Sequence, residues 1–470
     1  MYRKSNRAQM KLEGFFLPFG GHLSSENRWV RMAKLMPWEL IEDLYAEDFV
    51  DDRTDGRPAL PARIAYGSLY IKEQENLSDE RTVEYISENP FAQYFLGLSE
   101  FRQEALFDSS MLTHFRKRFT AEKIEKINES LYRRMPPSKP PEDGSNDGTL
   151  ILDATAAPAD MRYPTDLSLL NECRENTERI IDKIWESTGR SGRRTRYSRK
   201  KARAKYLKVA KQRKPRKKKI RKRISEQLTY TQNNIALIDS LLPEALNGLN
   251  PNDISRLEVI RMVVHQQAEM LRTNSHSIEN RIVSLRQPHV RPIVRGKAKT
   301  PVEFGQKIAI SVVRGYTFIE KQMWNNFSEG STLKESAEKY KERHGVYPAA
   351  ILADMTYRNR ENLRFCKEVG IRLTGPRLGR PKAEELKADK KQAYKDSCER
   401  NMVEGRIGIG KRRYGLDLIM AKLASTAQTE AALNVLVMNV ALLLRAFLRL
   451  FSKWVRKPFM PVPFGATFRA

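Results

Sequence analysis

The chain has 470 residues, 40% of them apolar, which is too long for one ordinary core and predicts two or three packed domains. Its formal net charge of +28 requires an anionic partner; nucleic acid is favoured, and an anionic membrane is the lesser alternative. Three cysteines without paired spacing argue against a disulfide framework and a cysteine-rich zinc site, and six scattered histidines show no zinc-catalysis pattern.

Apolar segments long enough for targeting or membrane insertion are not expected. The basic N-terminus is not followed by an apolar stretch of signal-peptide length. The most apolar segment, 431–444, runs about 14 residues without a charge, short of the roughly 18 that a membrane span needs. We therefore expect a buried helix there, and the three unpaired cysteines suit a reducing cytosol.

The region from about 30 to 135 has apolar residues at three- and four-residue spacing, which predicts several short helices. One of them, over 108–119, begins with good N-cap residues and ends in Arg116, Lys117 and Arg118. We expect residues 1–135 to form an all-α DNA-binding domain that presents a helix to a groove. The alternative is a helical support domain whose basic residues are only solvated.

A segment rich in proline, glycine and polar residues follows and cannot sustain a helix or a central strand. We place a linker there, at 136–148. It separates the helical domain from a catalytic domain at 149–460, which is followed by a short tail at 461–470.

The catalytic domain begins with an apolar run, 149–156, that predicts a strand carrying Asp153. A charged residue inside such a run is unfavourable unless it is paired or bound to a metal, although an aspartate that caps the strand end is the alternative. Residues 158–166 predict a short extended stretch, and residues 167–187 predict a helix.

A dense basic block follows between 190 and 223, with about twenty lysines and arginines and no acidic residue. Such a block repels itself and should be partly disordered without counter-ions. We expect phosphate contacts with little sequence discrimination, a solvated helix face being the alternative. The residues expected to make these contacts are Arg193, Arg194, Lys200, Lys217 and Lys218. With further helices, separated by breaks at Pro243 and Pro251, the block forms a basic helical insertion at about 186–287.

Sheet patterning resumes at 304–324, where two alternating runs flank Arg314 and Gly315 and predict a β-hairpin. A helix over 333–343, a buried strand over 349–354 that ends in Asp354, another helix and a short strand follow. This order predicts a mixed α/β sheet whose carboxylates gather at strand ends, where open sheets place their sites.

A strong helix-forming segment, 383–402, leads to Glu404 at its end and then to a glycine-rich loop with Lys411, Arg412 and Arg413. Arg400 and Glu404 are four residues apart and share a helix face, so a surface ion pair is the simplest explanation. A carboxylate beside a cationic, glycine-rich loop also suits close approach to a phosphate backbone. Together with the two strand-borne aspartates, it has the oxygen ligands that a two-metal phosphoryl-transfer site requires.

The pattern Arg400-x3-Glu404-x6-Lys411 resembles the block around the catalytic glutamate of bacterial insertion-sequence transposases of the DDE type, in their InsH-like branch. The helical region around 38–119 resembles that branch as well. So do four further segments, in order and spacing: 150–155, 163–170, 303–307 and 352–357. The wider family has a tyrosine three residues before the arginine, where this chain has Ser397; the difference concerns a supporting contact to the DNA end.

The resemblance implies an RNase-H-like catalytic core in which Asp153, Asp354 and Glu404 hold two Mg²⁺ ions, with Mn²⁺ as a substitute. Arg400 would orient the glutamate and the DNA end, and Lys411 would contact phosphate. The implied partners are double-stranded DNA, as terminal inverted repeats and target, and a second copy of the chain in a homodimeric synaptic complex.

In the implied reaction, water attacks the phosphodiester at the element's end, and the freed 3′-OH then attacks target DNA. Two alternatives stay open. One is a metal-dependent DNA nuclease with the same core, and the other is a catalytically inactive, transposase-derived DNA-binding protein.

Overall fold

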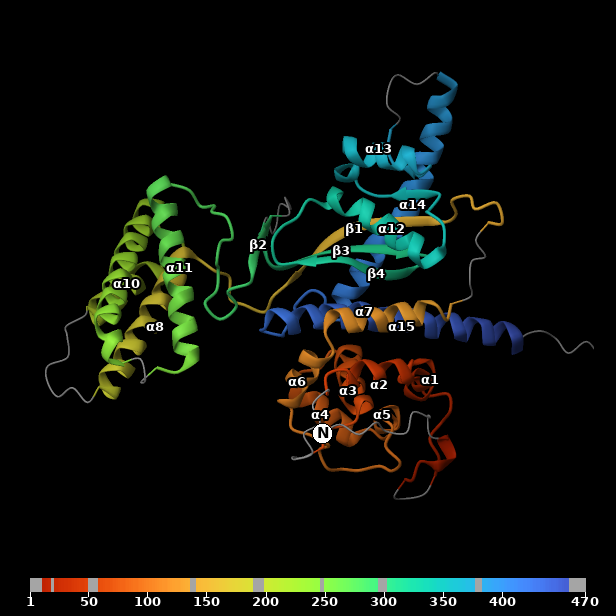
Figure 1. The fold of residues 1–470 in the computed structure, drawn as a ribbon, viewed down its shortest axis with the longest axis horizontal. Coiled ribbons are helices and arrows are strands. Elements are labelled where there is room, and N and C mark those ends of the chain that lie inside the picture. Colours follow the sequence, from red (N-terminus) through yellow and green to blue (C-terminus); the bar gives the residue numbers. More distant parts are fainter. Residues whose placement is uncertain are drawn as a thin grey trace, which may run out of the picture.

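The computed structural model describes residues 11–17, 21–49, 58–135, 141–188, 198–245, 249–294, 302–376 and 383–455. Figure 1 shows a group of N-terminal helices, a mixed sheet with helices around it, and a helical bundle that projects from one side of the sheet. A short 3-10 helix, η1 (Leu12–Gly14), precedes the first α-helix.

The N-terminal helices are held together by a largely aromatic core. Asn27, Ser78, Asn89 and Thr120 cap four of them by accepting hydrogen bonds from backbone N–H groups of the first turn, as their polar side chains favour. The helices are α1 (Arg28–Leu35), α2 (Trp38–Ala46), α3 (Ala62–Glu75), α4 (Asp79–Glu88), α5 (Pro90–Phe95), α6 (Met111–Arg118) and α7 (Ala121–Tyr132). The helices predicted in this region are therefore confirmed.

The basic end of α6 does not form a free cationic face, contrary to the expectation for a helix presented to a groove. Arg116 is buried and donates two hydrogen bonds to Asp79, at 2.9 and 2.6 Å. The guanidinium of Arg118 lies 4.0 Å from the centre of the Phe49 ring. Only Lys117 of the three is exposed. Two of the three cations thus stabilise the helical core.

The sheet has six strands in the order β2-β3-β1-β5-β6, with β4 also paired to β3. They are β1 (Thr149–Pro158), β2 (Arg291–Val294), β3 (Val302–Val313), β4 (Tyr316–Met323), β5 (Ala350–Leu352) and β6 (Arg372–Leu373). β3 is antiparallel to β1, β2 and β4, whereas β5 is parallel to β1 and β6. The predicted mixed α/β sheet is present.

The predicted β-hairpin joins β3 to β4 through Arg314 and Gly315, whose φ angles are 54° and 81°. Positive φ at both central residues gives a turn whose twist matches that of the flanking strands. After β4 come η3 (Glu329–Thr332), α12 (Leu333–His344), η4 (Met355–Tyr357) and α13 (Arg360–Glu368). The predicted end of α12 at Gly345 is confirmed, with this glycine in the left-handed conformation.

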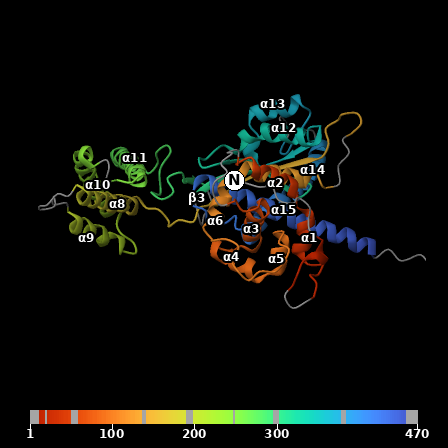
Figure 2. The same ribbon diagram turned by 60° about the horizontal axis from the view of Figure 1, so that its bottom comes forward.

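The bundle contains four helices, with apolar cores between them: α8 (Asp166–Ser187), α9 (Arg199–Ala210), α10 (Lys217–Ala245) and α11 (Pro251–Thr273). Figure 2 shows α9 beside α8 and α10. The bundle begins at Asp166, whereas the sequence placed the insertion at about 186–287. The extended stretch predicted at 158–166 is not a separate strand, since β1 continues to Pro158 and α8 begins soon after.

The basic block is more ordered than its composition predicted. Residues 199–210 form α9, because Ala202 and Val209 are buried against the bundle and carboxylates of neighbouring helices pair with Arg199 and Lys205. Pro243 does not end a helix, as had been predicted, because α10 continues to Ala245. Pro251, in contrast, opens α11 in its first turn, where its missing N–H is not needed.

The last two helices are α14 (Ala383–Arg413) and α15 (Ala424–Val455). α15 packs on α3, α6 and α7 as well as on β4, so the N-terminal helices and the sheet share one hydrophobic core (Figure 1). Ala424–Ala446 is long and apolar enough to cross a membrane by composition, but 72% of its apolar window is buried inside the protein. The predicted buried helix is confirmed, while the division into separate domains stays a prediction.

Candidate functional site

The parallel pairing of β1 with β5 brings the two predicted aspartates to the same edge of the sheet. Ile151 lies opposite Leu352 in this ladder, the last residue pair in its register. Asp153 and Asp354 each follow two residues later, so both stand where the ladder ends. Asp153 itself is in the middle of β1, since the antiparallel pairing with β3 continues past it to Pro158. The prediction that Asp153 ends a strand therefore holds only for the β5 side.

Asp153 is partly buried and surrounded by negative charge. Its Oδ1 accepts a hydrogen bond from the Ala154 N–H at 2.7 Å. Burial raises the pKa of the Asp153 carboxyl to about 6; the Ala154 N–H opposes the rise, and the negative charges of Glu329 and Asp354 add to it. A carboxyl in such surroundings is stabilised in its ionised form by a nearby cation.

That cation is the guanidinium of Arg400. Its Nη1 donates to Asp354 Oδ1 at 2.5 Å, and its Nη2 donates to Glu404 Oε1 at 3.4 Å. The side chains of Asp354 and Glu404 are 51% and 57% exposed, whereas Arg400 is 30% exposed, so the acids are accessible from solvent. Arg400 thus bonds Asp354 and Glu404, and its charge also acts on Asp153.

The sequence predicted Glu404 at the end of a helix, but in the structure it lies within α14. α14 continues through Gly405, Gly408 and Gly410 to Arg413, so the expected glycine-rich loop is helical. Glycine in a helix is unfavourable by about 1 kcal/mol relative to alanine, and tertiary packing offsets this. At Gly410 the segment after α14 packs closely on the helix, since an added Cβ would lie 3.2 Å from Leu416 Cδ2.

Because this segment is helical, the predicted DNA contacts at its end have a defined direction. Lys411 is eleven residues beyond Arg400 and seven beyond Glu404, spacings close to whole helical turns, so the three side chains share one face. Lys411 is half-buried, and Arg412 and Arg413 are exposed. Arg412 folds back and donates from Nε to the Gly408 carbonyl at 3.2 Å.

The side chains at this site are of the right kind for hard divalent ions, which prefer carboxylate oxygens. Among the residues that the structure describes, no three His, Cys, Asp or Glu side chains lie close enough together to hold a metal ion. The positive charge between Asp354 and Glu404 is that of Arg400. Asp354 and Glu404 already pair with one cation, Arg400, and their oxygens, with that of Asp153, are of the kind that a divalent ion binds. The three carboxylates are nevertheless too far apart to form one coordination sphere.

Family comparisons agree with both halves of the chain. The model of a transposase DDE domain matches residues 351–441, and that of a transposase domain (DUF772) matches residues 18–118. The chain is thus similar to transposase domains over two separate segments. It is 31% identical over 140 residues to the uncharacterized protein ORF8 in the nfe locus of Rhizobium meliloti, a match covering 30% of this chain and 66% of that relative, just under two thirds of its length. No solved structure matches the chain.

The DDE-domain match includes Asp354, Arg400, Glu404 and Lys411, whereas Asp153 lies outside both matched segments. Sequence reasoning missed Glu329, whose charge acts on Asp153 and whose Oε1 pairs with Lys307 Nζ at 3.0 Å. An isolated glutamate in a polar loop gives no signal in the sequence, because only the folded chain brings it near the strand.

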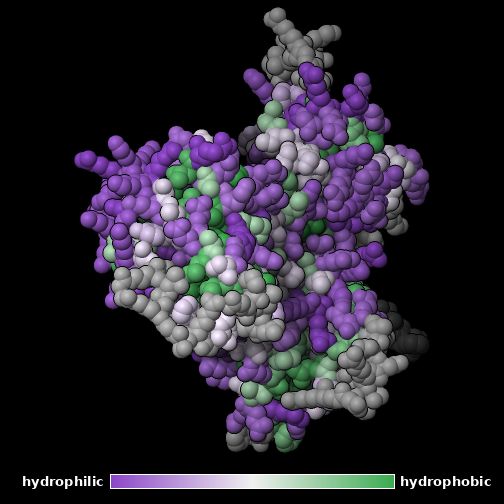
Figure 3. Space-filling model, turned by 60° about the vertical axis from the view of Figure 1, so that its left-hand side comes forward, coloured by the Kyte–Doolittle hydropathy of each residue, from purple (hydrophilic) through white to green (hydrophobic). Residues whose placement is uncertain are grey.

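The bundle presents much of the chain's surplus positive charge. Lys200, Lys217 and Lys218 are exposed and make no ion pair with any residue in the described ranges, while Arg193 and Arg194 lie outside the described residues. Seen from the side of the bundle, the surface is mostly hydrophilic, with smaller apolar patches (Figure 3). Some of the block is already neutralised, since Lys205 pairs with Glu226 at 3.1 Å.

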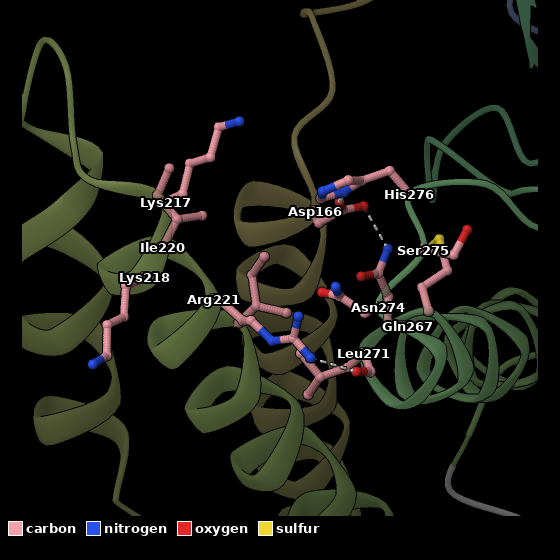
Figure 4. A pocket seen from close by; sticks show the side chains of 12 residues that line it. Asp166, Lys217, Lys218, Ile220, Arg221, Gln267, Leu271, Asn274, Ser275 and His276 are labelled. Atoms are coloured by element: carbon pink, nitrogen blue, oxygen red, sulfur yellow. Dashed lines mark hydrogen bonds and ion pairs between the residues drawn. The ribbon is translucent and has the colours of Figure 1, made fainter.

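A hollow of about 570 Å³ lies between the start of α10 and the end of α11, and Lys217 and Lys218 are on its rim. Figure 4 shows Arg221 reaching from α10 toward Leu271, to whose carbonyl it donates a hydrogen bond of 2.9 Å. Gln267 donates to Asp166 at 2.8 Å across the hollow. Lys217 and Lys218 give the rim positive charge, whereas Asp166 and apolar side chains also line the hollow, so it is the rim that suits contact with an anion.

Proposed function

We propose that the chain is an insertion-sequence transposase that binds the terminal inverted repeats of its element, hydrolyses the phosphodiester at the element's end and transfers the 3′-OH strand to target DNA as a homodimer. One observation carries this proposal. Asp153 and Asp354 each follow the last residue pair of the β1–β5 ladder by two residues, and Arg400 of α14 bonds both Asp354 and Glu404. Three antiparallel strands followed by two parallel ones support an RNase-H-like core.

In the proposed site, Asp153, Asp354 and Glu404 would hold two Mg²⁺ ions, and Mn²⁺ would substitute for them. Such ions, when bound, activate the attacking oxygen and stabilise the leaving oxygen of the phosphodiester. Asp153 is held on a central strand, so its carboxylate has little freedom to move. Arg400 supplies a positive charge beside the acids. Its guanidinium would stabilise the negative charge that develops on the phosphate of the DNA end in the transition state.

DNA would be held by charges outside the acidic site. Lys411, Arg412 and Arg413 continue along α14 from Glu404, and the unpaired lysines of α9 and α10 form a second cationic region. Contacts of this kind bind the phosphate backbone and position the duplex without reading its sequence. The acidic site and the cationic surfaces therefore have separate tasks, and substitutions can separate them.

The test uses linear duplex DNA that carries both flanks of the element, with purified chain and Mg²⁺. We expect Asp153→Asn, Asp354→Asn and Glu404→Gln each to abolish cleavage while gel-shift binding stays within about twofold of the unsubstituted chain. Glu361→Gln removes an exposed carboxylate on α13 and serves as the matched control. Full cleavage by any of the three variants would remove that residue from the site. Cleavage without joined strand-transfer products would identify a nuclease in place of a transposase.

A further inference from the structure

Arg406 is a buried cation on α14, two residues beyond Glu404. It is 9% exposed, and its guanidinium is bonded only to neutral acceptors. Nε donates to Thr317 Oγ1 at 3.1 Å, and Nη2 donates to Asn439 Oδ1 at 2.8 Å and to the Met438 carbonyl at 3.3 Å. No Asp or Glu within the described ranges pairs with it. Arg406 thus joins α14 to β4 and α15.

The groups around Arg406 form a connected hydrogen-bond network. Asn439 Oδ1 also accepts from the Thr317 N–H at 3.0 Å, and its Nδ2 donates to the Thr317 carbonyl at 2.7 Å and to Asn128 Oδ1 at 3.0 Å. Tyr316 donates its hydroxyl to Asn128 Oδ1 at 2.8 Å. Four elements, α7, β4, α14 and α15, therefore meet at one polar junction, which fixes their relative positions more narrowly than apolar packing does.

The position of Arg406 relative to Glu404 determines what this junction controls. Two residues along a helix turn the side chain by about 200°, so the two point to opposite faces of α14. The guanidinium points into the core while the carboxylate points to the acidic site. The bonds of Arg406 restrain the rotation and sliding of α14, and they thereby restrain the position of Glu404.

Apolar packing holds this stretch of α14 only in part, through Ile407 and Ile409, which are partly buried against the core. Three of the six residues from Gly405 to Gly410 are glycines, which offer no side chain for packing, and an added Cβ at Gly405 would meet no atom within 4 Å. Val403 is fully buried, but apolar contacts are not directional and set the rotation of a helix less narrowly than hydrogen bonds do. Directional bonds from Arg406 supply what the glycines lack.

A buried charge without a counter-charge is unfavourable, and an apolar side chain of similar size would pack there at lower cost. Burial lowers the pKa of Arg406 to about 10, so the group stays charged at neutral pH. The arrangement is therefore hard to explain as stabilisation alone.

We infer that Arg406 is a positioning residue that sets the place of Glu404 through its bonds to Thr317 and Asn439. This inference rests on the proposed function, in which Glu404 binds metal. Displacement of a metal ligand by loss of its supporting contacts typically reduces affinity or rate 10- to 100-fold. Loss of the positive charge would by itself strengthen cation binding, so a weaker binding in a neutral variant reports position and not charge.

The test measures Mn²⁺ binding by calorimetry alongside the kcat and KM of cleavage and the thermal midpoint. Arg406→Met removes the bonds, Arg406→Lys keeps only the charge, and Thr317→Val removes one acceptor with little change of shape. Lys391→Met is the control, because it removes an exposed cation of the same helix that has no place in the proposed site. We expect at least about tenfold weaker Mn²⁺ binding and lower kcat at unchanged KM for Arg406→Met, smaller losses for Thr317→Val and Arg406→Lys, and none for the control.

Wild-type Mn²⁺ affinity and kcat in folded Arg406→Met and Thr317→Val would overturn the positioning role. Should Arg406→Met fail to fold, Thr317→Val decides alone. Glu404→Gln separates this inference from the proposed function. Unchanged Mn²⁺ binding and cleavage in that variant would overturn the metal site itself, whereas losses there with wild-type behaviour in Thr317→Val would overturn only the role of Arg406.

Discussion

Arg400 donates a hydrogen bond to Asp354 across 46 residues of sequence, and the same guanidinium reaches Glu404 on its own helix. One cation therefore joins two of the acids proposed to bind metal. It keeps Asp354 and Glu404 from repelling each other, and it competes with any divalent ion for the same oxygens. This double role makes Arg400 the most informative side chain of the site.

Replacing Arg400 by glutamine should leave stability within about 1 kcal/mol, because its ion pairs are largely exposed and such pairs contribute little. Cleavage should fall about 100-fold, since the charge that stabilises the phosphate in the transition state is lost. Thermal unfolding and the cleavage assay measure the two effects. Arg364→Gln, an exposed arginine of α13, is the control. A wild-type rate in Arg400→Gln would mean that the cation only separates the acids.

Neutralising Lys217 and Lys218 together should weaken DNA binding and flatten its salt dependence. Each lost phosphate contact lowers the slope of log affinity against log salt by about 0.9, so the double variant to glutamine should lower it by up to about 1.8. Filter binding at several salt concentrations measures the slope. Lys205→Gln is the control, because Lys205 already pairs with Glu226. An unchanged slope in the double variant would make the rim of the α10–α11 hollow a solvated surface.

Glu125 of α7 should make stability depend on pH. Burial raises the pKa of its carboxyl to about 7, with Lys339 opposing and Glu320 adding to the rise. Between about 4.5, the usual value, and 7, the folded state binds more protons than the unfolded state, so this group's contribution to stability falls as pH rises through that window. Glu125→Gln should therefore stabilise the fold at pH 8, by on the order of 1–3 kcal/mol.

Urea unfolding of wild type and Glu125→Gln at pH 5 and pH 8 tests this sign, and other titrating groups cancel in the comparison. The gain should be clearly smaller at pH 5. Equal gains at both values would show that the carboxyl ionises normally in the folded protein.

Two glycines should respond to alanine in opposite directions. At Gly305, where β3 pairs with the end of β1, an added Cβ would lie 2.1 Å from the Ala157 carbonyl oxygen, so Gly305→Ala should destabilise by more than about 2 kcal/mol. At Gly405 no atom lies within 4 Å, and Gly405→Ala should stabilise the helix by about 0.5–1 kcal/mol. Urea unfolding measures both. Stabilisation at Gly305 would show that β1 and β3 can separate there.

Local chemistry made several elements predictable. The alternation on either side of Arg314 and Gly315 specified the hairpin, and Gly345 specified the end of α12. In each case the residues that decide the structure are within a few positions of one another. The strand that carries Asp153 was predictable for the same reason, because short apolar runs mark buried strands. The strand before Asp354 was predicted as well, but it ends at Leu352, and Asp354 precedes the first turn of η4.

The length of α14 was not predictable, because three glycines after Glu404 indicate a loop. The helix persists there since Val403 and Arg406 are anchored to distant elements, and that support is absent from the local sequence. The prediction that the basic end of α6 is free to contact DNA was wrong for a similar reason. Arg116 has its partner, Asp79, 37 residues away, so its burial could not be read from the helix alone.

The sequence by itself determined the acids, the cationic surplus and the family pattern that relates them, because residue types and spacings carry that information. Only the tertiary structure decided that Asp153 and Asp354 share one edge of the sheet and that Arg400 joins Asp354 to Glu404. It also decided that Arg406 joins α14 to β4 and α15. These relations depend on strand register and helix rotation. Both are set by contacts between residues far apart in the chain, which no local pattern specifies.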